Sequence, residues 1–502
     1  MGLGDWPRPI NLMKKRIHEV LGVTIAILAS CLIQAKQSNV LFIICDDLNV
    51  HLSAAGYDQV PTPELDGLAS ESITFTRAYC QYPVCGPSRA SLLSGLYPES
   101  TGVLNNTVDI RETRPGTVSL PQRFKDSGYW TVGVGKIFHN SKFTPTEEAW
   151  DEFIKFKNDK HGIEIKAQAE FEAKNGSIDD RKNRQAWKAF LSAYSTQTHG
   201  QTPPGYGPTD LSDEQHMDGK NARQVADWLD NQSYGEKPFF IACGIQKPHV
   251  PFLAPQKYFD RFPLGEIEYD PIRLDDWEDI PEKAASLRFR AFGFEMSKEN
   301  DSLRREYMQA YHACISFIDT QLGFVFDALK ESGHWEDTII VFTSDHGYHL
   351  GEHSMWGKVT LFEECARVPM MMRVPGMTPA GVKSDALVEH VDFYPTLLEL
   401  CELDAASPLQ GKSVVPLLKN PEMKGKDYAY TVVSRGQQLG RSIRSDLWRY
   451  AEWFDAENAE LYDLKEDPKE YTNLARNPEY ASRLKIMRKA LAEAKQSAGR
   501  ER

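Results

Sequence analysis

The sequence lacks an apolar run long enough to cross a membrane. Its longest apolar stretch, Val20 to Ile33, is shorter than the roughly 20 residues of a spanning helix. A basic cluster, Met13 to Arg16, precedes that stretch, as it does at the start of a signal peptide. We therefore expect residues 1–35 to be the targeting segment of an exported protein.

Two kinds of processing fit this segment. Leu28-Ala29-Ser30-Cys31 is similar to a bacterial lipobox, which would make Cys31 the lipid anchor of an outer-membrane or surface lipoprotein. Cleavage after Ala35 would instead release a soluble enzyme into the bacterial periplasm. The sequence leaves both alternatives open.

The sequence also lacks an excess of basic residues and a pattern of paired cysteines. Its 58 Lys and Arg residues are outnumbered by 71 Asp and Glu residues, which gives a net charge of −13. Nucleic-acid-binding proteins carry basic faces, so we expect no nucleic-acid partner. The 8 cysteines have neither close pairs nor metal-site spacing, so we expect no disulfide framework.

Four apolar runs each end in a group of polar residues. The runs have the length and composition of strands buried on both faces. Helical patterns separate them, which predicts an α/β fold with a large mixed, mostly parallel sheet flanked by helices. Because the carboxyl ends of parallel strands share one edge, the four polar groups should meet there. The runs are 39–45, 129–134, 239–243 and 338–343, and the residues that follow them include Asp46, Asp47, Lys136, His139, His249, Asp345 and His346.

The residues at this edge suit a metal-dependent reaction. Asp46, Asp47 and Asp345 would repel one another unless a cation held them together. Carboxylate oxygens favour a hard cation, Ca²⁺ or alternatively Mg²⁺. The neighbouring cationic side chains would bind an anion on that metal. This combination fits the hydrolysis of a phosphate or sulfate ester, in which charge grows on the departing oxygen.

The segment Cys85-Gly86-Pro87-Ser88-Arg89 adds a candidate reactive residue. Pro87 in a first helical turn and Gly95 at the end predict a helix that begins at Cys85. The positive end of this helix, together with Arg89, would stabilise an anion at position 85.

This segment and four others resemble one family. C-x-P-S-R, followed by a downstream Leu-x-Gly, is the signature of type I, formylglycine-dependent sulfatases. The five segments are most similar, in the same order, to those of iduronate-2-sulfatases within that family. The resemblance implies an alkaline-phosphatase-like fold with a small C-terminal α+β subdomain that carries an antiparallel sheet. The segments are 45–48, 84–89, 135–139, 247–252 and 343–353, and the implied parts are a catalytic domain at 36–436 and the subdomain at 437–502.

The resemblance also implies a mechanism. In this family a formylglycine-generating or sulfatase-maturing enzyme oxidises the signature cysteine, here Cys85, to formylglycine. One hydroxyl of the hydrated aldehyde attacks sulfur and expels the alcohol, and the other then collapses to the aldehyde and releases sulfate. By this resemblance Ca²⁺ would be held by Asp46, Asp47, Asp345, His346 and modified Cys85. The diol and the sulfate would be stabilised by Arg89 and Lys136, and His139 would deprotonate the second hydroxyl. Sulfate binding and assistance to the leaving group would come from His249 and Lys358.

Three functions follow as alternatives. The first is a sulfatase that acts on a sulfated carbohydrate, with an exo-acting enzyme for 2-O-sulfated uronates as the finer expectation. The second is a phosphodiesterase or phosphonate monoester hydrolase of the same superfamily. The third is a lipoprotein that binds sulfated glycan without turnover because Cys85 stays unmodified.

Several nearby polar residues have no assigned chemistry. We expect His349 to face the substrate, and either His349 or an Arg from the polar insertions to be the partner of a substrate carboxylate. We expect His353 to be structural, and Glu363 and Glu364 to lie on a helix surface. The polar tracts 155–235 and 264–302 are expected to be insertions that overhang the pocket.

Overall fold

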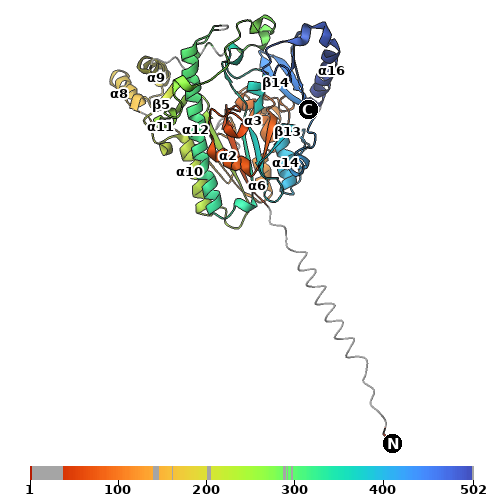
Figure 1. The fold of residues 1–502 in the computed structure, drawn as a ribbon. Coiled ribbons are helices and arrows are strands. Elements are labelled where there is room, and N and C mark those ends of the chain that lie inside the picture. The colour runs from red at the N-terminus through yellow and green to blue at the C-terminus, as the bar shows by residue number, and fades with distance from the viewer. Residues whose placement is uncertain are drawn as a thin grey trace. The chain divides into compact units, whose positions relative to one another are not determined.

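Strand β1, Asn39–Asp46, runs through the nine-stranded sheet that organises the fold (Figure 1). The computed structural model describes residues 1–2, 38–139, 146–160, 162–199, 205–286, 290, 292–295 and 298–499. The expected processing sites at Cys31 and Ala35 lie outside the described residues. Among those described, none of the helices combines the length and the hydropathy that crossing a membrane requires.

The strands of this sheet follow the order β11-β2-β12-β8-β1-β6-β3-β4, and β13 also pairs with β2. The neighbours from β8 to β4 are all parallel, whereas β12 and β11 run antiparallel to their partners. The prediction of a mixed, mostly parallel sheet is therefore confirmed. The bounds are β2 Ile73–Tyr79, β3 Trp130–Gly135, β4 Glu152–Ile154, β6 Phe239–Pro248, β8 Thr338–Ser344, β11 Arg367–Val368, β12 Met370–Arg373 and β13 Val382–Glu389.

Alternate residues of β1 enter two different hydrophobic cores. Leu41, Ile43 and Cys45 belong to one cluster, and the residues between them belong to the other. This division follows from the two-residue period of a strand that is covered on both faces. The first core is closed by α2 Pro63–Ser70, α10 Met217–Asp230 and α12 Asp301–Glu331, and the second by α3 Cys85–Ser94, α6 Leu120–Asp126 and α14 Phe393–Leu400.

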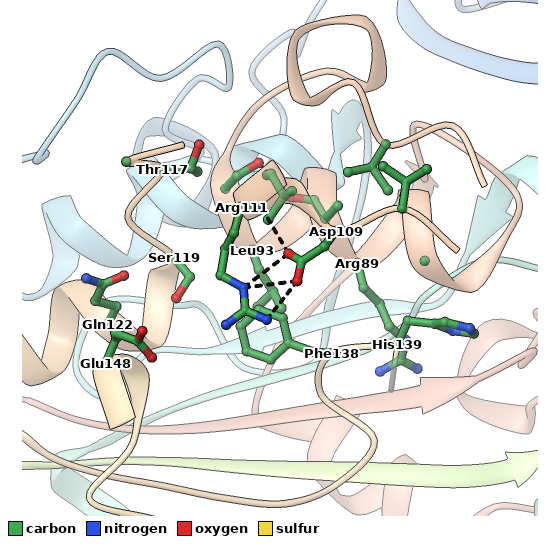
Figure 2. A pocket seen from close by; sticks show the side chains of 17 residues that line it. Arg89, Leu93, Asp109, Arg111, Thr117, Ser119, Gln122, Phe138, His139 and Glu148 are labelled. Atoms are coloured by element: carbon green, nitrogen blue, oxygen red, sulfur yellow. Dashed lines mark hydrogen bonds and ion pairs between the residues drawn. The ribbon is translucent and has the colours of Figure 1, made fainter. Parts of the chain in front are cut away.

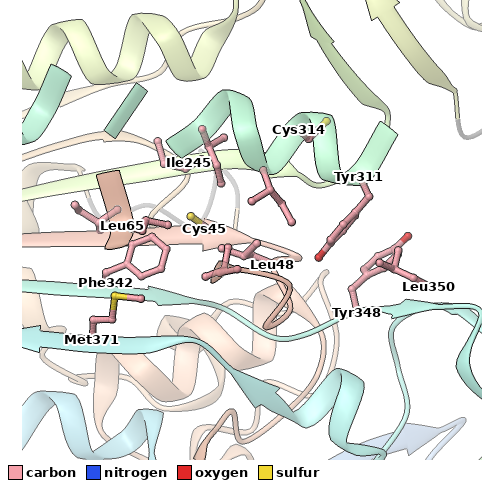
Figure 3. Packing of buried hydrophobic residues seen from close by; sticks show 14 of the residues in the cluster. Cys45, Leu48, Leu65, Ile245, Tyr311, Cys314, Phe342, Tyr348, Leu350 and Met371 are labelled. Carbon is pink, nitrogen blue, oxygen red and sulfur yellow. The ribbon is translucent and has the colours of Figure 1, made fainter. Parts of the chain in front are cut away.

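The long helix α12 covers the first core. Figure 3 shows Tyr311 of this helix pointing toward Leu48, after β1, and Tyr348, after β8. Asn300 caps its N-terminus by accepting a hydrogen bond from the amide of Leu303 at 3.3 Å. This cap fixes the start of α12 at Asp301.

A second, four-stranded antiparallel sheet occupies the C-terminal region. It contains β14 Ala429–Arg435, β15 Gln438–Arg444, β16 Trp448–Trp453 and β17 Asp455–Asp463, and α16 Ala481–Ala498 packs against it. The antiparallel sheet and final helix match the expected subdomain. Gly436, the proposed end of the catalytic domain, lies in the turn between β14 and β15 with a φ of 64°.

The remaining elements are short connections and the helices of the 155–235 tract. Helices α8 and α9 of that tract pack together through Phe171 and Trp187. The bounds are α4 Pro98–Thr101, α5 Ile110–Thr113, α7 Thr146–Ala149, α8 Gly162–Asn175, α9 Arg184–His199, α11 Gln256–Phe259, α13 Glu363–Ala366, α15 Val415–Lys419, β5 Tyr206–Thr209, β7 Phe252–Pro255, β9 His349–Leu350 and β10 Trp356–Gly357.

Candidate active site

The polar groups that end β1 and β8 lie side by side. The parallel register pairs Cys45 with Ser344, so the next residues of both strands emerge at the same edge. Asp47 adopts a φ of 65°, and its amide donates to Oδ1 of Asp345 at 3.1 Å. Asp46, Asp47 and Asp345 are each fully buried. Three carboxylates therefore share one water-excluded pocket, as the sequence predicts.

Cys85 lies at the first position of α3, which ends at a left-handed Gly95. Its side chain faces the carboxylates, because Sγ is 3.8 Å from Oδ1 of Asp47 and 3.5 Å from Nε2 of His346. Nζ of Lys358 lies 3.0 Å from the same sulfur. The thiol thus lies between the carboxylate of Asp47 and the ammonium group of Lys358, and Cys85 is only 1% exposed.

Three buried cations balance the carboxylates. The guanidinium of Arg89 contacts Asp345 at 2.9 Å and Asp46 at 3.6 Å. Lys136 pairs with Asp46, and Lys358 pairs with Asp47. These cations offset the negative charge of the carboxylates and leave the pocket suited to an anionic substrate.

The donor set fits a divalent cation. Oδ1 of Asp46 and Oδ2 of Asp47 are buried without a hydrogen-bond partner among the described residues. Candidate ligand atoms of Asp46, Cys85, Asp345 and His346 all lie within 4.8 Å of one another. Buried carboxylate oxygens that lack donors are the ligands a hard cation takes.

The pKa values in the pocket depend on these neighbours. Burial opposes the thiolate of Cys85, but Lys136 and Lys358 together lower its pKa well below the ordinary value. Burial raises the pKa of Asp345 to about 6, and Asp345 in turn raises the pKa of His346 to about 9 against the effect of burial. An anion at position 85 is thus stabilised inside the pocket.

Two more histidines reach Cys85 from neighbouring strand ends. His139 follows β3 and His249 follows β6, and both lie near enough to the Cys85 side chain to lower its pKa. Nδ1 of His249 is 2.6 Å from the carbonyl of Val250, which directs Nε2 toward Asp47 at 4.0 Å. The side chains expected to hold the metal and the sulfate therefore lie together at this edge of the sheet.

Two residues of the site carry no assignment from sequence. Gln246 donates from Nε2 to Oδ2 of Asp46 at 3.0 Å, and its position beside His249 at the end of β6 is the available signal. Asn106 accepts from the amide of Gly86 at 2.8 Å and so supports the first turn of α3. No sequence pattern distinguishes Asn106, because the contact depends on the tertiary fold.

Two expectations about neighbouring residues are wrong. His349 is fully buried, with Nε2 2.8 Å from Oγ1 of Thr360, and burial lowers its pKa well below the ordinary value. It is therefore a neutral core residue and not a cation that faces substrate. Glu363 and Glu364 are each partly buried and do not form a free helix surface, because Glu363 bonds to Arg444 at 2.9 Å and Oε2 of Glu364 is inaccessible to solvent.

A cavity of about 260 Å³ adjoins the site along one face of α3. Figure 2 shows Arg89 and His139 together at one side of it, with an ion pair between Asp109 and Arg111 across its middle. Leu93 and Phe138 supply apolar walls. The cavity thus offers space, charge and apolar contact next to the catalytic residues.

Comparisons with known proteins agree with this geometry. A family profile described as sulfatase matches residues 38–403, and one described as the C-terminal part of N-sulphoglucosamine sulphohydrolase matches residues 351–497. A sulfatase of Formosa agariphila is 35% identical, with 95% of this chain and 92% of that protein covered. The mouse iduronate 2-sulfatase is 27% identical over 87% of this chain and 76% of its own.

A solved structure extends the likeness to the fold. The phosphonate monoester hydrolase of Agrobacterium radiobacter has a TM-score of 0.71 and 23% identity, and the match covers 92% of this chain and 96% of that protein. The alkaline-phosphatase-like fold implied by the sequence is thereby confirmed. Given a family match over most of its length and a relative at 35% identity, the chain belongs to the sulfatase family.

Proposed function

We propose that this protein hydrolyses the sulfate ester of a sulfated carbohydrate through a hydrated formylglycine made from Cys85. The observation that carries the proposal is the position of Cys85. Its side chain is within hydrogen-bonding reach of Lys358, His346 and Asp47 in a pocket that excludes water. A thiol that served only as a core residue would not need three ionisable partners.

The surrounding side chains suit the two stages of the reaction. Arg89 and Lys136 offset the charge of the sulfate and of the residue-85 oxygens. Lys358 and His249 are placed to donate a proton to the departing alcohol oxygen, because both lie beside the Cys85 side chain. His139 reaches residue 85 from β3 and is the proposed base for the second hydroxyl.

Asp46, Asp47, Asp345 and His346 are the proposed metal ligands. Conversion of the thiol to a hydrated aldehyde replaces sulfur with oxygens, which makes the donor set harder and favours Ca²⁺ over softer metals. When bound, the cation neutralises the carboxylates and polarises a sulfate oxygen. Mg²⁺ is the alternative ion.

The finer proposal is exo-action on a terminal 2-O-sulfated uronate. It is supported by the likeness to an iduronate 2-sulfatase over most of the chain. A uronate carboxylate needs a cation beyond those that hold sulfate, and the buried His349 does not provide one. Lys155, directly after β4, is exposed, and desolvation together with the positive charges of Lys136 and Arg89 lowers its pKa. We assign the carboxylate contact to Lys155.

The proposal is tested first by mass spectrometry of the tryptic peptide Ala78–Arg89 from active protein. Formylglycine at position 85 is expected, and an unmodified thiol in fully active protein would disprove the mechanism. An unmodified thiol in inactive protein that binds sulfated glycan would favour the non-catalytic alternative.

Rates on matched aryl sulfate, aryl phosphate and phosphonate esters then separate the remaining alternatives. A higher kcat/KM for the sulfate ester is expected. A preference for phosphate or phosphonate would assign the protein to the other hydrolases of this fold, such as the phosphonate monoester hydrolase of Agrobacterium radiobacter.

A further inference from the structure

A second cluster of metal-ligating side chains lies apart from Cys85. His353 follows β9, Glu364 lies in α13, and Glu470 follows the C-terminal sheet. One ligand atom from each of these residues lies within 4.8 Å of the others. The cluster therefore joins the segment that precedes Lys358 to the C-terminal region.

The imidazole of His353 is oriented as in a metal site. Its Nδ1 is 2.9 Å from Oδ2 of Asp276, so the Nδ1 proton is donated to that carboxylate and Nε2 is left facing the cluster. Nε2 is buried and has no hydrogen-bond partner among the described residues, and His353 is only 3% exposed. A carboxylate behind a ligating histidine is the usual arrangement that fixes its tautomer.

One carboxylate of the cluster, that of Glu364, also lacks a donor, whereas that of Glu470 is paired. Oε2 of Glu364 is buried without a partner among the described residues. Glu470, fully buried, is paired with Arg449 and accepts from the amide of Glu363 at 3.0 Å. Arg449 thus pairs with Glu470 and His353 contacts Asp276, whereas Glu364 has no ion-pair partner among the described residues.

We propose that His353, Glu364 and Glu470 bind a second divalent metal ion of the Zn²⁺ class. One imidazole nitrogen and two carboxylates form a three-ligand set of the kind that binds Zn²⁺. The ion would supply the cation that Glu364 lacks. The ion is structural, because it fastens the C-terminal region to the segment that leads to Lys358, and Asp276 acts as a positioning residue.

The test uses the full-length protein stripped with a chelator and titrated with Co²⁺, whose tetrahedral complexes absorb visible light. We expect one Co²⁺ with visible absorption in the wild type. Glu364→Gln and His353→Asn should abolish that absorption, and Zn²⁺ should compete for the site. Asp276→Asn should weaken the affinity about 10- to 100-fold, as loss of an orienting carboxylate does.

Two controls separate this site from its surroundings. Glu352→Gln changes an acid on the same loop outside the ligand set and should retain the absorption. Asp46→Asn changes the catalytic pocket and should also retain it. A wild type with no Co²⁺ absorption, or absorption that is lost in Asp46→Asn but kept in Glu364→Gln, would overturn the proposal. Circular dichroism of Glu364→Gln shows that the loss is not unfolding.

Discussion

Gly244 allows the end of β3 to approach β6 closely enough to place Lys136. The carbonyl of Gly244 accepts from the Lys136 amide at 3.3 Å and from Nδ2 of Asn221 at 3.0 Å. A Cβ on Gly244 would lie 2.4 Å from both the backbone nitrogen and the carbonyl carbon of Lys136. Backbone atoms cannot rotate away, so Gly244→Ala must separate the two strand ends.

The structure sets the size of this effect. Ordinary contact begins near 3.4 Å, so the strand ends must separate by about 1 Å. Overpacking of this kind costs about 1–3 kcal/mol of unfolding free energy. A displacement of about 1 Å at a catalytic group lowers kcat/KM roughly 100-fold. We expect both losses in Gly244→Ala.

Urea unfolding and aryl sulfate kinetics measure the two effects. Gly67→Ala is the matched control, because a Cβ on this helical glycine would have no atom within 4 Å other than the backbone of its own helix. That variant should gain about 0.5–1 kcal/mol and keep full activity. Gly244→Ala with wild-type stability and kcat/KM would refute the argument that close strand approach positions Lys136.

Four further predictions concern the site and its supports. Cys85→Ala should abolish sulfatase turnover while circular dichroism and Tm stay close to wild type. Asp345→Asn should lower bound metal, measured by elemental analysis, and reduce kcat/KM by at least about 100-fold, because an anionic ligand is lost. Lys155→Met should raise KM about tenfold for a sulfated uronate, the effect of losing a charged hydrogen bond, but leave aryl sulfate kinetics unchanged. Burial raises the pKa of Asp218 to about 6, although the amides of Gln246 and Lys247 donate to it. In the folded state the Asp218 carboxyl thus keeps its proton up to about pH 6, whereas in the unfolded chain it loses the proton near about pH 4. Asp218 therefore lowers the free energy of unfolding as the pH rises from about 4 to 6. Asp218→Asn should remove that part of the pH dependence in urea unfolding, by up to about 3 kcal/mol.

The central strands could be predicted because burial on both faces leaves an unbroken apolar run. The same reasoning places Asp46 and Asp345, since each directly follows such a run. By contrast, β4 and β11 contain too few residues for a pattern to emerge. The suggested boundary of the C-terminal subdomain follows Gly436, which lies in the turn of the hairpin after β14. It therefore separates β14 from the antiparallel sheet to which this strand belongs.

The supports of the site were harder to predict because they depend on contacts between distant residues. Glu364 has the sequence context of an exposed helix, but α13 is only 4 residues long and faces Glu470 and His353. His349 lies four residues after Asp345 in the same sequence motif, but strand β9 places its side chain in the core. Neither environment is determined by neighbours in sequence.

The burial of Cys85 also limits when the residue can be modified. Its contact with Lys358 spans 273 residues, so the pocket that encloses the thiol is incomplete until the chain beyond position 358 exists. At about 5–20 residues per second, ribosomal synthesis of that interval takes roughly 14–55 s. An enzyme that modifies Cys85 therefore competes with folding, and slower closure of the sheet would increase the fraction of chains that mature.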